Sequence, residues 1–375
     1  MTVRVLFCRS NAVAPDPRVE KAARALQRHG YSVHILAWDR STAWPRQETR
    51  DGLPIERIAL AAAFGQGLRN LPALTRWQAA LTRWLWRHRR EFDVIHACDF
   101  DTVLPALLCK RWCGHRVVYD IFDFYAAHVR APRPLKALLQ RIEWWAVRQA
   151  DATIIVDESR RHQLRGAQPQ HLTVIYNTPE DRRQALPSPP PSPPGALRLA
   201  YIGALMAGRG LPMLLRILRR HPAWHLDLAG FGSLAAALQA EAQSLPNVTW
   251  HGRVLYEDAL RLSAQADALL ALYDPRVPNH RYASPNKVFE AMMLGKPVVT
   301  TQGTSIDQLV QQWQCGLAVP YGDEAALENA LTTLAAAPET RRRLGRYARR
   351  AYETAYAWPK MAQRLVALYE RIMKS

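Results

Sequence analysis

Short runs of apolar and β-branched residues alternate with longer amphipathic stretches along most of the chain. The runs lie at residues 3–7, 32–37, 55–59, 93–97, 116–119, 153–156 and 172–175, and then at residues 197–202, 225–229, 248–250, 268–272, 297–300 and 316–319. Stretches with helical periodicity separate most neighbouring runs, for example residues 17–29 and 134–149. Because parallel strands need crossover connections, this alternation predicts an α/β protein with doubly wound parallel sheets.

A proline-rich segment interrupts the alternation once. Residues 186–195 read Leu-Pro-Ser-Pro-Pro-Pro-Ser-Pro-Pro-Gly, which is incompatible with the interior of a helix or sheet and typical of a stiff, extended linker. The length of 375 residues suits two domains. We therefore predict two Rossmann-like domains facing across a cleft, at residues 1–182 and 197–355, with a linker at residues 183–196. Residues 356–375 are predicted to form a helix that packs back toward the first domain.

The formal net charge of +18 at pH 7 favours anionic partners such as acidic lipid headgroups, phosphorylated small molecules or nucleic acid. Arginine outnumbers lysine, and a GC-rich genome produces the same balance, so composition alone leaves both explanations open. A nucleic-acid-binding protein would also carry a recognised binding module. We find no such module in the sequence, and a specific nucleic-acid partner is not expected.

The cysteines and the N-terminal residues indicate the cellular compartment of the protein. The five cysteines form no CxxC pair; Cys109 and Cys113 could share a helix face, but a zinc site needs more ligands. An odd, scattered set suits reduced thiols in the cytosol. The N-terminal apolar run is too short for a signal peptide, and no apolar stretch reaches 18 residues. We expect a cytoplasmic protein that uses neither a metal ion nor another cofactor.

The segment that begins at Ser284 carries the most informative chemistry. Serine as N-cap, Pro285 in the first turn and a stop at Gly295 predict a helix. The first N–H groups of a helix bind phosphate well, and Lys287 adds a positive charge at this end. Glu290 could accept hydrogen bonds from sugar hydroxyls. A capped surface helix without a ligand explains the same pattern, so the segment alone leaves both interpretations open.

Together with motifs elsewhere, this segment resembles the donor-binding segment of family 4 glycosyltransferases, in the bacterial exopolysaccharide and O-antigen branch with the pattern S-P-N-K-x-F-E-x-M-x-x-G-K-P. Residues 284–297 read Ser-Pro-Asn-Lys-Val-Phe-Glu-Ala-Met-Met-Leu-Gly-Lys-Pro. Further matches follow in order at residues 16–20, 94–105, 118–123, 201–203, 209–210 and 321–323 and at Trp358. The resemblance implies the GT-B fold and metal-independent transfer of a sugar from a nucleotide diphosphate donor.

The resemblance also implies residues on the donor side. Arg209 and the start of the predicted helix would stabilise the charge that develops on the departing diphosphate, and Glu290 would hold the ribose hydroxyls. Glycines would let the ligand approach the backbone, although the pair in Gly230-Phe-Gly232 also fits a simple tight turn. The predicted donor site consists of Gly203, Arg209, Gly230, Gly232, Ser284, Pro285, Asn286, Lys287 and Glu290.

On the acceptor side, the first loop and a later strand end resemble the family's acceptor-binding segments. The acceptor-side residues are Asn11, Asp16, Arg18 and Asp99. The predicted catalytic residues are Asp120, Asp123, Arg209 and Glu290. Family 4 enzymes are retaining, so the departing phosphate could accept the proton of the acceptor hydroxyl, and no protein base would then be needed. Each aspartate could also be a structural residue that caps a loop. Asp99-Phe-Asp101 resembles a metal-binding DxD motif, but those sites belong to a different glycosyltransferase fold.

Three positions depart from the family pattern. Tyr282 stands where the first of two glutamates is usual, Ala204 replaces a frequent arginine, and Phe122 replaces a frequent histidine. A degenerate, non-catalytic relative is therefore one alternative. A sugar-nucleotide epimerase of the same fold is another, and it would need no membrane-binding helix.

Residues 71–90, from Leu71 to Arg90, predict a basic amphipathic helix. Leucine and tryptophan recur with helical spacing on one face and arginines supply the charge, as in helices that lie at the headgroup boundary of anionic bilayers. Residues 133–148, from Arg133 to Arg148, form a second candidate. Packing of both helices against the sheet is the alternative. The membrane interpretation places the protein on the inner face of the plasma membrane, with a polyprenyl-diphosphate-linked saccharide as acceptor in exopolysaccharide or lipopolysaccharide synthesis.

Overall fold

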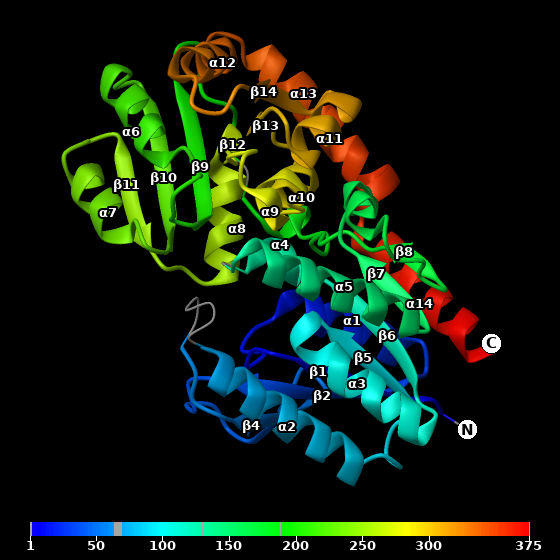
Figure 1. Cartoon of the computed structure of the whole chain (residues 1–375). Coiled ribbons are helices and arrows are strands. Elements are labelled where there is room, and N and C mark those ends of the chain that lie inside the picture. Colours follow the sequence, from blue (N-terminus) through cyan, green and yellow to red (C-terminus); the bar gives the residue numbers. More distant parts are fainter. Residues whose placement is uncertain (1, 64–69, 130, 188, 375) are drawn as a thin grey trace. The chain divides into compact units, whose positions relative to one another are not determined.

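The computed structural model describes residues 2–63, 70–129, 131–187 and 189–374 (Figure 1). The chain divides into two compact units, one made of Met1–Tyr176 with Met361–Ser375 and the other of Asn177–Lys360. Each unit contains one sheet, which is parallel except for a single edge strand in the first unit. The α/β fold with two Rossmann-like sheets is therefore confirmed.

The first unit is an eight-stranded sheet in the order β3-β4-β2-β1-β5-β6-β7-β8. Its elements are β1 (Arg4–Arg9), α1 (Pro17–Arg28), β2 (Ser32–Asp39), β3 (Gln47–Arg50), β4 (Leu53–Ala59), α2 (Leu71–Arg87), β5 (Val94–Cys98), α3 (Phe100–Cys113), β6 (Arg116–Ile121), α4 (Tyr125–His128), α5 (Arg133–Gln149), β7 (Ala152–Ile155), a 3₁₀ helix (Glu158–Leu164) and β8 (Leu172–Val174). The sequence pattern missed β3, which pairs antiparallel with β4, because its residues Gln-Glu-Thr-Arg contain no apolar side chain.

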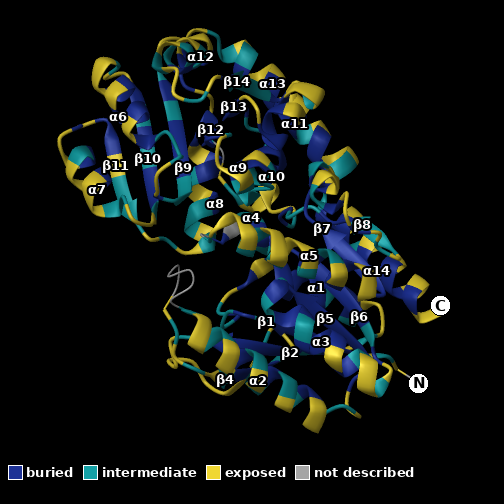
Figure 2. Ribbon diagram, in the orientation of Figure 1, coloured by how far each residue is buried: buried dark blue, intermediate teal, exposed yellow. Residues whose placement is uncertain are grey.

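Helices α2, α3 and α5 bury one face of this sheet. Trp77, Leu81 and Leu85 of α2 are at most 1% exposed and join the core beneath it, whereas the outer side of the helix is exposed (Figure 2). The Trp77 ring stacks on Trp38 of β2, with 5.1 Å between ring centroids. The apolar stripe that suggested a membrane-facing surface thus packs against the protein's own sheet, which buries Trp77, Leu81 and Leu85 and partly buries Leu74 and Trp84.

The C-terminal helix α14 (Trp358–Lys374) packs on the first unit, as predicted. Tyr369 contributes a hydroxyl that lies 2.8 Å from Nδ1 of His96, and its ring packs edge-on against Tyr31. Arg364 donates a hydrogen bond of 3.0 Å to the carbonyl oxygen of Val174. From Met361 onward the chain therefore belongs to the first unit although it follows the second in sequence.

The second unit is a six-stranded parallel sheet in the order β11-β10-β9-β12-β13-β14. Its elements are a 3₁₀ turn (Arg183–Ala185), β9 (Leu197–Ala204), α6 (Leu211–Arg220), β10 (Trp224–Phe231), α7 (Ala235–Gln243), β11 (Val248–Gly252), α8 (Tyr256–Gln265), β12 (Ala268–Ala271), α9 (Pro278–Arg281), α10 (Asn286–Leu294), β13 (Val298–Thr301), α11 (Ser305–Trp313), β14 (Gly316–Val319), α12 (Glu324–Ala336), α13 (Pro338–Ala351) and a π-helical turn (Tyr352–Tyr356). One apolar core lies between its strands and helices α6, α7, α12 and α13.

The proline-rich segment lies within the second unit, because the chain passes from one unit to the other at Tyr176 and Asn177. The backbone N–H of Ser192 donates to Asp267 at 3.0 Å, and the buried Arg341 donates to the carbonyl oxygen of Ser192. The described part of this segment is therefore attached to the second unit through Ser192, and the stiff interdomain linker predicted at residues 183–196 falls inside that unit.

Candidate functional site

Two cations meet at the carboxyl ends of β9 and β12 in the second unit. The guanidinium carbon of Arg209 lies 3.9 Å from the ring centroid of Tyr273, and Nζ of Lys287 lies 3.7 Å from that of Tyr201. Nε and Nη1 of Arg209 are buried without a hydrogen-bond partner among the described residues. Neither cation forms an ion pair with a described residue. Buried N–H donors without acceptors are costly, so this arrangement favours binding of an anion.

The ionisation of Lys287 reflects its surroundings. Burial disfavours the charged ammonium and lowers the pKa of Lys287 to about 7; the nearby charge of Arg209 also lowers it, while Glu290 opposes the shift. Glu290 accepts a hydrogen bond from the hydroxyl of Tyr256. Burial and the carboxylate of Glu290 both raise the pKa of Tyr256. One carboxylate thus faces two cations, which leaves a net positive site.

Helix α10 presents its first turn at the same place, but it begins one residue later than predicted. Its first residue is Asn286, Pro285 occupies the N-cap position in an extended conformation, and no side chain caps the helix. Oγ of Ser284 is buried without a hydrogen-bond partner in the described part of the chain. Because the first N–H groups of a helix lack internal acceptors, this end adds donors for an anion beside Lys287.

The glycines at this edge of the sheet leave out a side chain for two different reasons. Gly203, at the end of β9, has a φ of +146°, and a Cβ there would lie 3.1 Å from Nζ of Lys287. Gly203 therefore makes room for the lysine. A Cβ on Gly230 would lie 1.8 Å from the carbonyl oxygen of Gly203, and one on Gly232 would lie 2.3 Å from that of Leu205. These two glycines are explained by close backbone packing between neighbouring strand ends.

Two departures from the family pattern also lie in this unit. Ala204 ends β9, and its carbonyl oxygen accepts a hydrogen bond of 2.8 Å from the hydroxyl of Tyr201, which positions the ring under Lys287. Tyr282 follows α9, and its ring is 5.9 Å from the guanidinium carbon of Arg281. The sequence pattern missed Tyr201, Tyr256 and Tyr273 because nothing in an isolated tyrosine marks it as the support of a cation.

The first unit gathers a second polar cluster at the carboxyl ends of β1, β5 and β6. Asp99 adopts a φ of +67°, a conformation that non-glycine residues rarely occupy and that is often found at functional sites. Its carboxylate pairs with Arg9 and accepts a hydrogen bond of 2.8 Å from the backbone N–H of Phe122. Burial raises the pKa of Asp99 to about 6; Arg9 opposes the shift and Asp123 adds to it.

Asp120 is held in a closed network in this unit. It forms an ion pair of 2.7 Å with Arg18, its second oxygen lies 3.4 Å from Nε2 of His96, and it is 4% exposed. Burial would raise the pKa of Asp120, but Arg18 and His96 outweigh that effect and lower it. The structure therefore places Asp120 beneath the surface as a partner of Arg18.

The neighbouring predicted residues lie around Asp99. Asp123 is exposed and forms an ion pair of 2.7 Å with the buried Arg160. The ring of Phe122 lies between two guanidinium groups, 4.2 Å from that of Arg9 and 4.7 Å from that of Arg18. A histidine at this position would meet the same two cations, so a phenylalanine avoids a third positive charge.

Asp16 and Asn11 complete the cluster. Asp16 accepts hydrogen bonds of 2.9 Å from Arg9 and 2.8 Å from the side-chain amide of Asn11, and it caps α1. Burial would raise the pKa of Asp16, but these partners lower it, with Arg9 the strongest. The pattern missed Arg9, which bridges Asp16 and Asp99; its position at the end of the first strand was the available signal. Asp101, the other member of the DxD resemblance, faces Arg40 instead, at 3.6 Å.

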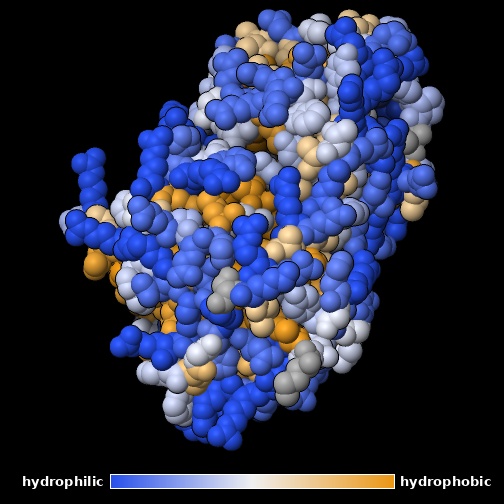
Figure 3. Space-filling view, turned by 90° about the vertical axis from the view of Figure 1, so that its right-hand side faces the viewer, coloured by the Kyte–Doolittle hydropathy of each residue, from blue (hydrophilic) through white to orange (hydrophobic). Residues whose placement is uncertain are grey.

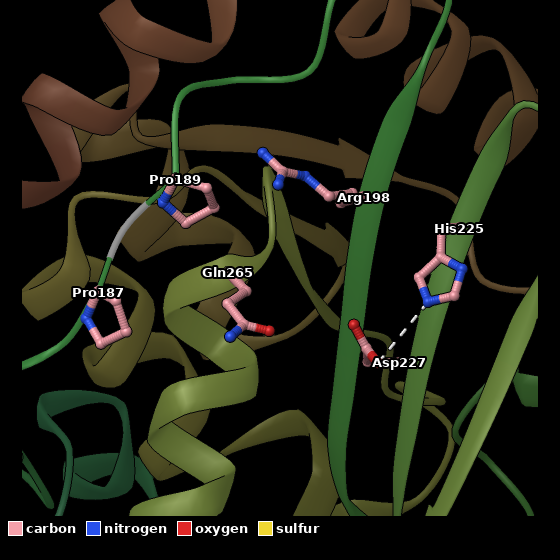
Figure 4. Close-up of a pocket in the computed structure, with 6 residues that line it drawn as sticks. All are labelled: Pro187, Pro189, Arg198, His225, Asp227 and Gln265. Atoms are coloured by element: carbon pink, nitrogen blue, oxygen red, sulfur yellow. Dashed lines mark ion pairs between the residues drawn. The ribbon is translucent and has the colours of Figure 1, made fainter.

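A cavity of about 660 Å³ lies elsewhere in the second unit (Figure 4). It is lined by Pro187, Pro189, Arg198, His225, Asp227 and Gln265. Arg198 and His225 are the second residues of β9 and β10, so the cavity lies toward the amino ends of these strands. Ligands of open parallel sheets bind beyond the carboxyl ends, where the cations gather, and the cavity is therefore a poor candidate for the donor site.

Comparisons with known proteins match both units. Residues 14–178 match the model described as "Glycosyl transferase 4-like domain", and residues 196–337 match "Glycosyl transferases group 1". Together the two models span most of the chain. This protein is a family 4-like, group 1 glycosyltransferase.

Individual relatives agree with the fold of this glycosyltransferase. It is 25% identical over 289 residues to a glycogen synthase of Mycobacterium tuberculosis, covering 74% of this chain and 68% of that protein. A sucrose-phosphate synthase from Thermosynechococcus elongatus superposes with a TM-score of 0.77 at 16% identity, over 99% of each chain. Anabaena Alr3699/HepE in complex with UDP and glucose gives a TM-score of 0.71 at 14% identity, over 98% of this chain and 100% of that one.

Proposed function

We propose that the glycosyltransferase moves a hexosyl residue, with retention of configuration, from a nucleotide diphosphate sugar to a polyprenyl-diphosphate-linked saccharide during synthesis of a bacterial surface polysaccharide. The observation that carries the donor half is the pair Arg209 and Lys287, two cations at the first turn of α10 that form no ion pair with a described residue. The lipid-linked acceptor rests on the exopolysaccharide-type Ser-Pro-Asn-Lys pattern and on the basic helix described below.

The donor site supplies what departure of a nucleoside diphosphate needs. Breaking the sugar–phosphate bond leaves negative charge on the phosphate oxygens, and donors fixed in advance stabilise it without reorganising. Arg209 is held on Tyr273 and Lys287 on Tyr201, so both cations are oriented before the ligand arrives. We assign Glu290, whose carboxylate accepts a hydrogen bond from Tyr256, to the ribose hydroxyls. Residues 203 and 284–287 line the same place through their backbone.

On the acceptor side, Asp99 fits the role of proton acceptor better than Asp120 or Asp123. A base that works near neutral pH needs a raised pKa, and the pKa of Asp99 is about 6, whereas Arg18 and His96 lower that of Asp120. Asp123 is occupied by Arg160. Asn11 and Asp16 then position Asp99 through Arg9, and Arg18 holds Asp120.

Nucleotide binding tests the donor assignment. In a thermal-shift and calorimetric panel of UDP, GDP, CDP, ADP and dTDP, we expect one nucleotide to stabilise the wild type by about 2.7 kcal/mol at a hundred times its Kd. Glu290→Ala and Arg209→Ala should lose most of this effect, while Arg216→Ala, an exposed arginine paired with Glu324, should keep it. Stabilisation by none of the five would contradict the proposal. Transfer to a polyprenyl-diphosphate saccharide, rather than to a soluble glucan, would support its acceptor half.

Binding should also take up a proton through Lys287. At pH 8 the free lysine, with a pKa of about 7, is mostly uncharged, and a diphosphate, itself fully ionised, restores its charge. Calorimetry in buffers of different ionisation enthalpy should show uptake of about one proton, and affinity should fall up to about tenfold per pH unit above pH 7. Lys287→Arg should abolish the uptake because arginine stays charged. Lys296→Arg is the matched control, since Lys296 is likewise partly buried, with a pKa lowered to about 8, but lies after α10.

We further propose that the first unit attaches to anionic membranes through exposed residues at the ends of α2 and α3. Trp86 is 46% and Trp112 53% exposed, and their rings meet edge-to-face at 5.5 Å. The same two helices and the residues after α2 carry exposed arginines: Arg76, Arg83, Arg87, Arg90 and Arg111. Tryptophan suits the headgroup region, and each basic side chain near an anionic surface contributes about 1 kcal/mol.

Figure 3 shows one side of the molecule, where apolar patches lie between hydrophilic side chains. In α5, Trp145 and Leu138 are exposed, whereas Trp144 donates to the carbonyl oxygen of Gln163. Among the described helices, none has the length and hydrophobicity needed to cross a bilayer.

Vesicle sedimentation tests this attachment. The wild type should co-sediment with vesicles containing phosphatidylglycerol at low salt and much less with vesicles of phosphatidylcholine alone. Salt at 1 M should release the protein, because the Debye screening length falls to about 3 Å. The Trp86→Ala/Trp112→Ala double variant should bind several-fold less, while Trp44→Ala, at another exposed tryptophan of the same unit, should not change binding. Equal binding by the double variant would contradict the proposed surface.

A further inference from the structure

Three potential metal ligands come together where α3 ends and β6 is about to begin. One side-chain atom each of Cys109, Cys113 and His115 lies within 4.8 Å of the other two. Cys109 and His115 are buried and Cys113 is partly exposed. The two cysteines alone offer too few ligands for a metal ion; the chain supplies a third by turning back at Gly114, which has a φ of +77°. The helix therefore presents two thiols one turn apart toward an imidazole.

The imidazole is held in the form that binds a metal. Nε2 of His115 lies 2.7 Å from the carbonyl oxygen of Arg89, which can only accept, so Nε2 carries the proton and Nδ1 has a free lone pair. Nδ1 faces Sγ of Cys109 at 3.6 Å. A hydrogen bond from ring nitrogen to a backbone carbonyl is the usual outer partner of a metal-binding histidine, because it fixes both tautomer and orientation.

The spacing fits a zinc ion. With a Zn–S bond of about 2.3 Å, a Zn–N bond of about 2.05 Å and a tetrahedral angle, the two ligand atoms would be about 3.6 Å apart. The same distance accommodates a weak thiol–imidazole hydrogen bond, so at this pair of ligands the ion would replace the thiol proton with little change in spacing. The Sγ atom of Cys113 lies within 4.8 Å of both. Two thiolates and a neutral imidazole balance the charge of a divalent cation. The partly exposed Cys113 leaves the fourth position open to water.

We propose that Cys109, Cys113 and His115 form a binding site for one thiophilic cation, with Zn²⁺ as the ion that fits. Binding forms two S–metal bonds and one N–metal bond and releases the two thiol protons to solvent. The site ties the end of α3 to the start of β6 and, through Arg89, to the segment after α2. It lies at the amino end of β6, whereas Asp120 lies near the carboxyl end, about 15 Å along the strand. Its role is therefore structural and separate from sugar transfer.

The location links this site to the exposed tryptophans. Trp112 precedes Cys113, and the guanidinium of Arg89 lies 4.6 Å from the ring centroid of Trp86. The bound ion would fix the two segments that carry Trp86 and Trp112. Metal binding itself does not depend on whether this surface contacts a membrane.

Zinc titration of the full-length, tag-free, reduced protein tests the proposal. After treatment with a chelator and buffer exchange, competition with a chromophoric zinc indicator should reveal one site with a Kd below about 1 μM. Cys113→Ser and His115→Gln should each weaken it by about 100-fold or more, whereas Cys315→Ala, a buried cysteine of the second unit, should bind like the wild type. Co²⁺ should produce a thiolate-to-metal absorption band in the wild type that Cys113→Ser diminishes.

Two results would overturn the proposal. One is the lack of a 1:1 site in the micromolar range or tighter. The other is equal zinc affinity in the wild type, Cys113→Ser and His115→Gln. Circular dichroism of the metal-free variants shows whether they are folded, and the cobalt spectrum reports on sulfur ligation directly, so weakened binding through misfolding is distinguishable from loss of a ligand.

Discussion

Replacing Arg209 with alanine is expected to lower kcat by about 10²- to 10³-fold, the usual cost of removing one donor from a developing oxyanion. The guanidinium is held on the ring of Tyr273, and two of its nitrogens have no other acceptor in the described structure. Its contribution should therefore appear mainly when charge builds on the diphosphate. The measurement is the initial rate of nucleotide release from the donor that the binding panel identifies.

A matched control separates this effect from a general loss of charge. Arg216→Ala removes an exposed arginine from α6 that pairs with Glu324, and its kcat should stay within about twofold of the wild type. Arg209→Ala should also raise the pKa of Lys287, because the arginine is one of the causes that lower it. The pH above which nucleotide binding weakens should then shift upward. A fall in kcat of less than tenfold, with that pH unchanged, would remove Arg209 from the donor site.

Replacing Arg18 with methionine is expected to destabilise the first unit by about 3–5 kcal/mol, because it leaves a buried carboxylate without its cation. The side chains of Arg18 and Asp120 are 6% and 5% exposed and lie 2.7 Å apart. Since the chain has two units, hydrogen exchange of the peptide that contains β6 is a better measure than a single melting curve. Its exchange rate should rise by about 10²- to 4 × 10³-fold.

Two further variants show whether burial is the cause. Arg18→Met combined with Asp120→Asn should recover much of the lost stability, because no uncompensated charge remains. Arg4→Met breaks an ion pair of nearly the same length, 2.8 Å, with Asp93, but both of those side chains are exposed, so its effect should be much smaller. Equal effects of Arg18→Met and Arg4→Met would contradict the explanation.

Several features could be read from the chain alone because they depend on local order. The alternation of apolar runs and amphipathic stretches predicted the parallel strands, since period and length are set within each segment. The Ser-Pro-Asn-Lys segment placed a helix start, Lys287 and Glu290 at one strand end for the same reason. That these residues lie together was thus predictable, because neighbouring parallel strands end at one edge of the sheet; their role as a donor site is our proposal.

Other features depend on which distant segments meet, and only the tertiary structure decided them. The stripe of Trp77, Leu81 and Leu85 has the same spacing whether it faces lipid or a sheet. In the folded protein it faces the sheet, where the ring of Trp77 stacks on Trp38. Asp99 and Asp120 look alike in sequence. The charge of Arg18 and the hydrogen bond to His96 lower the pKa of Asp120 in spite of its burial, whereas burial, with the nearby charge of Asp123, raises the pKa of Asp99.

The sequence by itself determined the order of the elements, the strongly basic character and the motif at α10, because these depend only on composition and on residues that are neighbours in the chain. The tertiary structure alone decided that the described part of the proline-rich segment is attached to the second unit, that Tyr201 and Tyr273 support the two donor-site cations, and that His115 joins Cys109 and Cys113. These outcomes rest on distances between residues that no local pattern encodes. Burial and charge act through those distances, so the chemistry of a side chain is set only when the chain has folded around it.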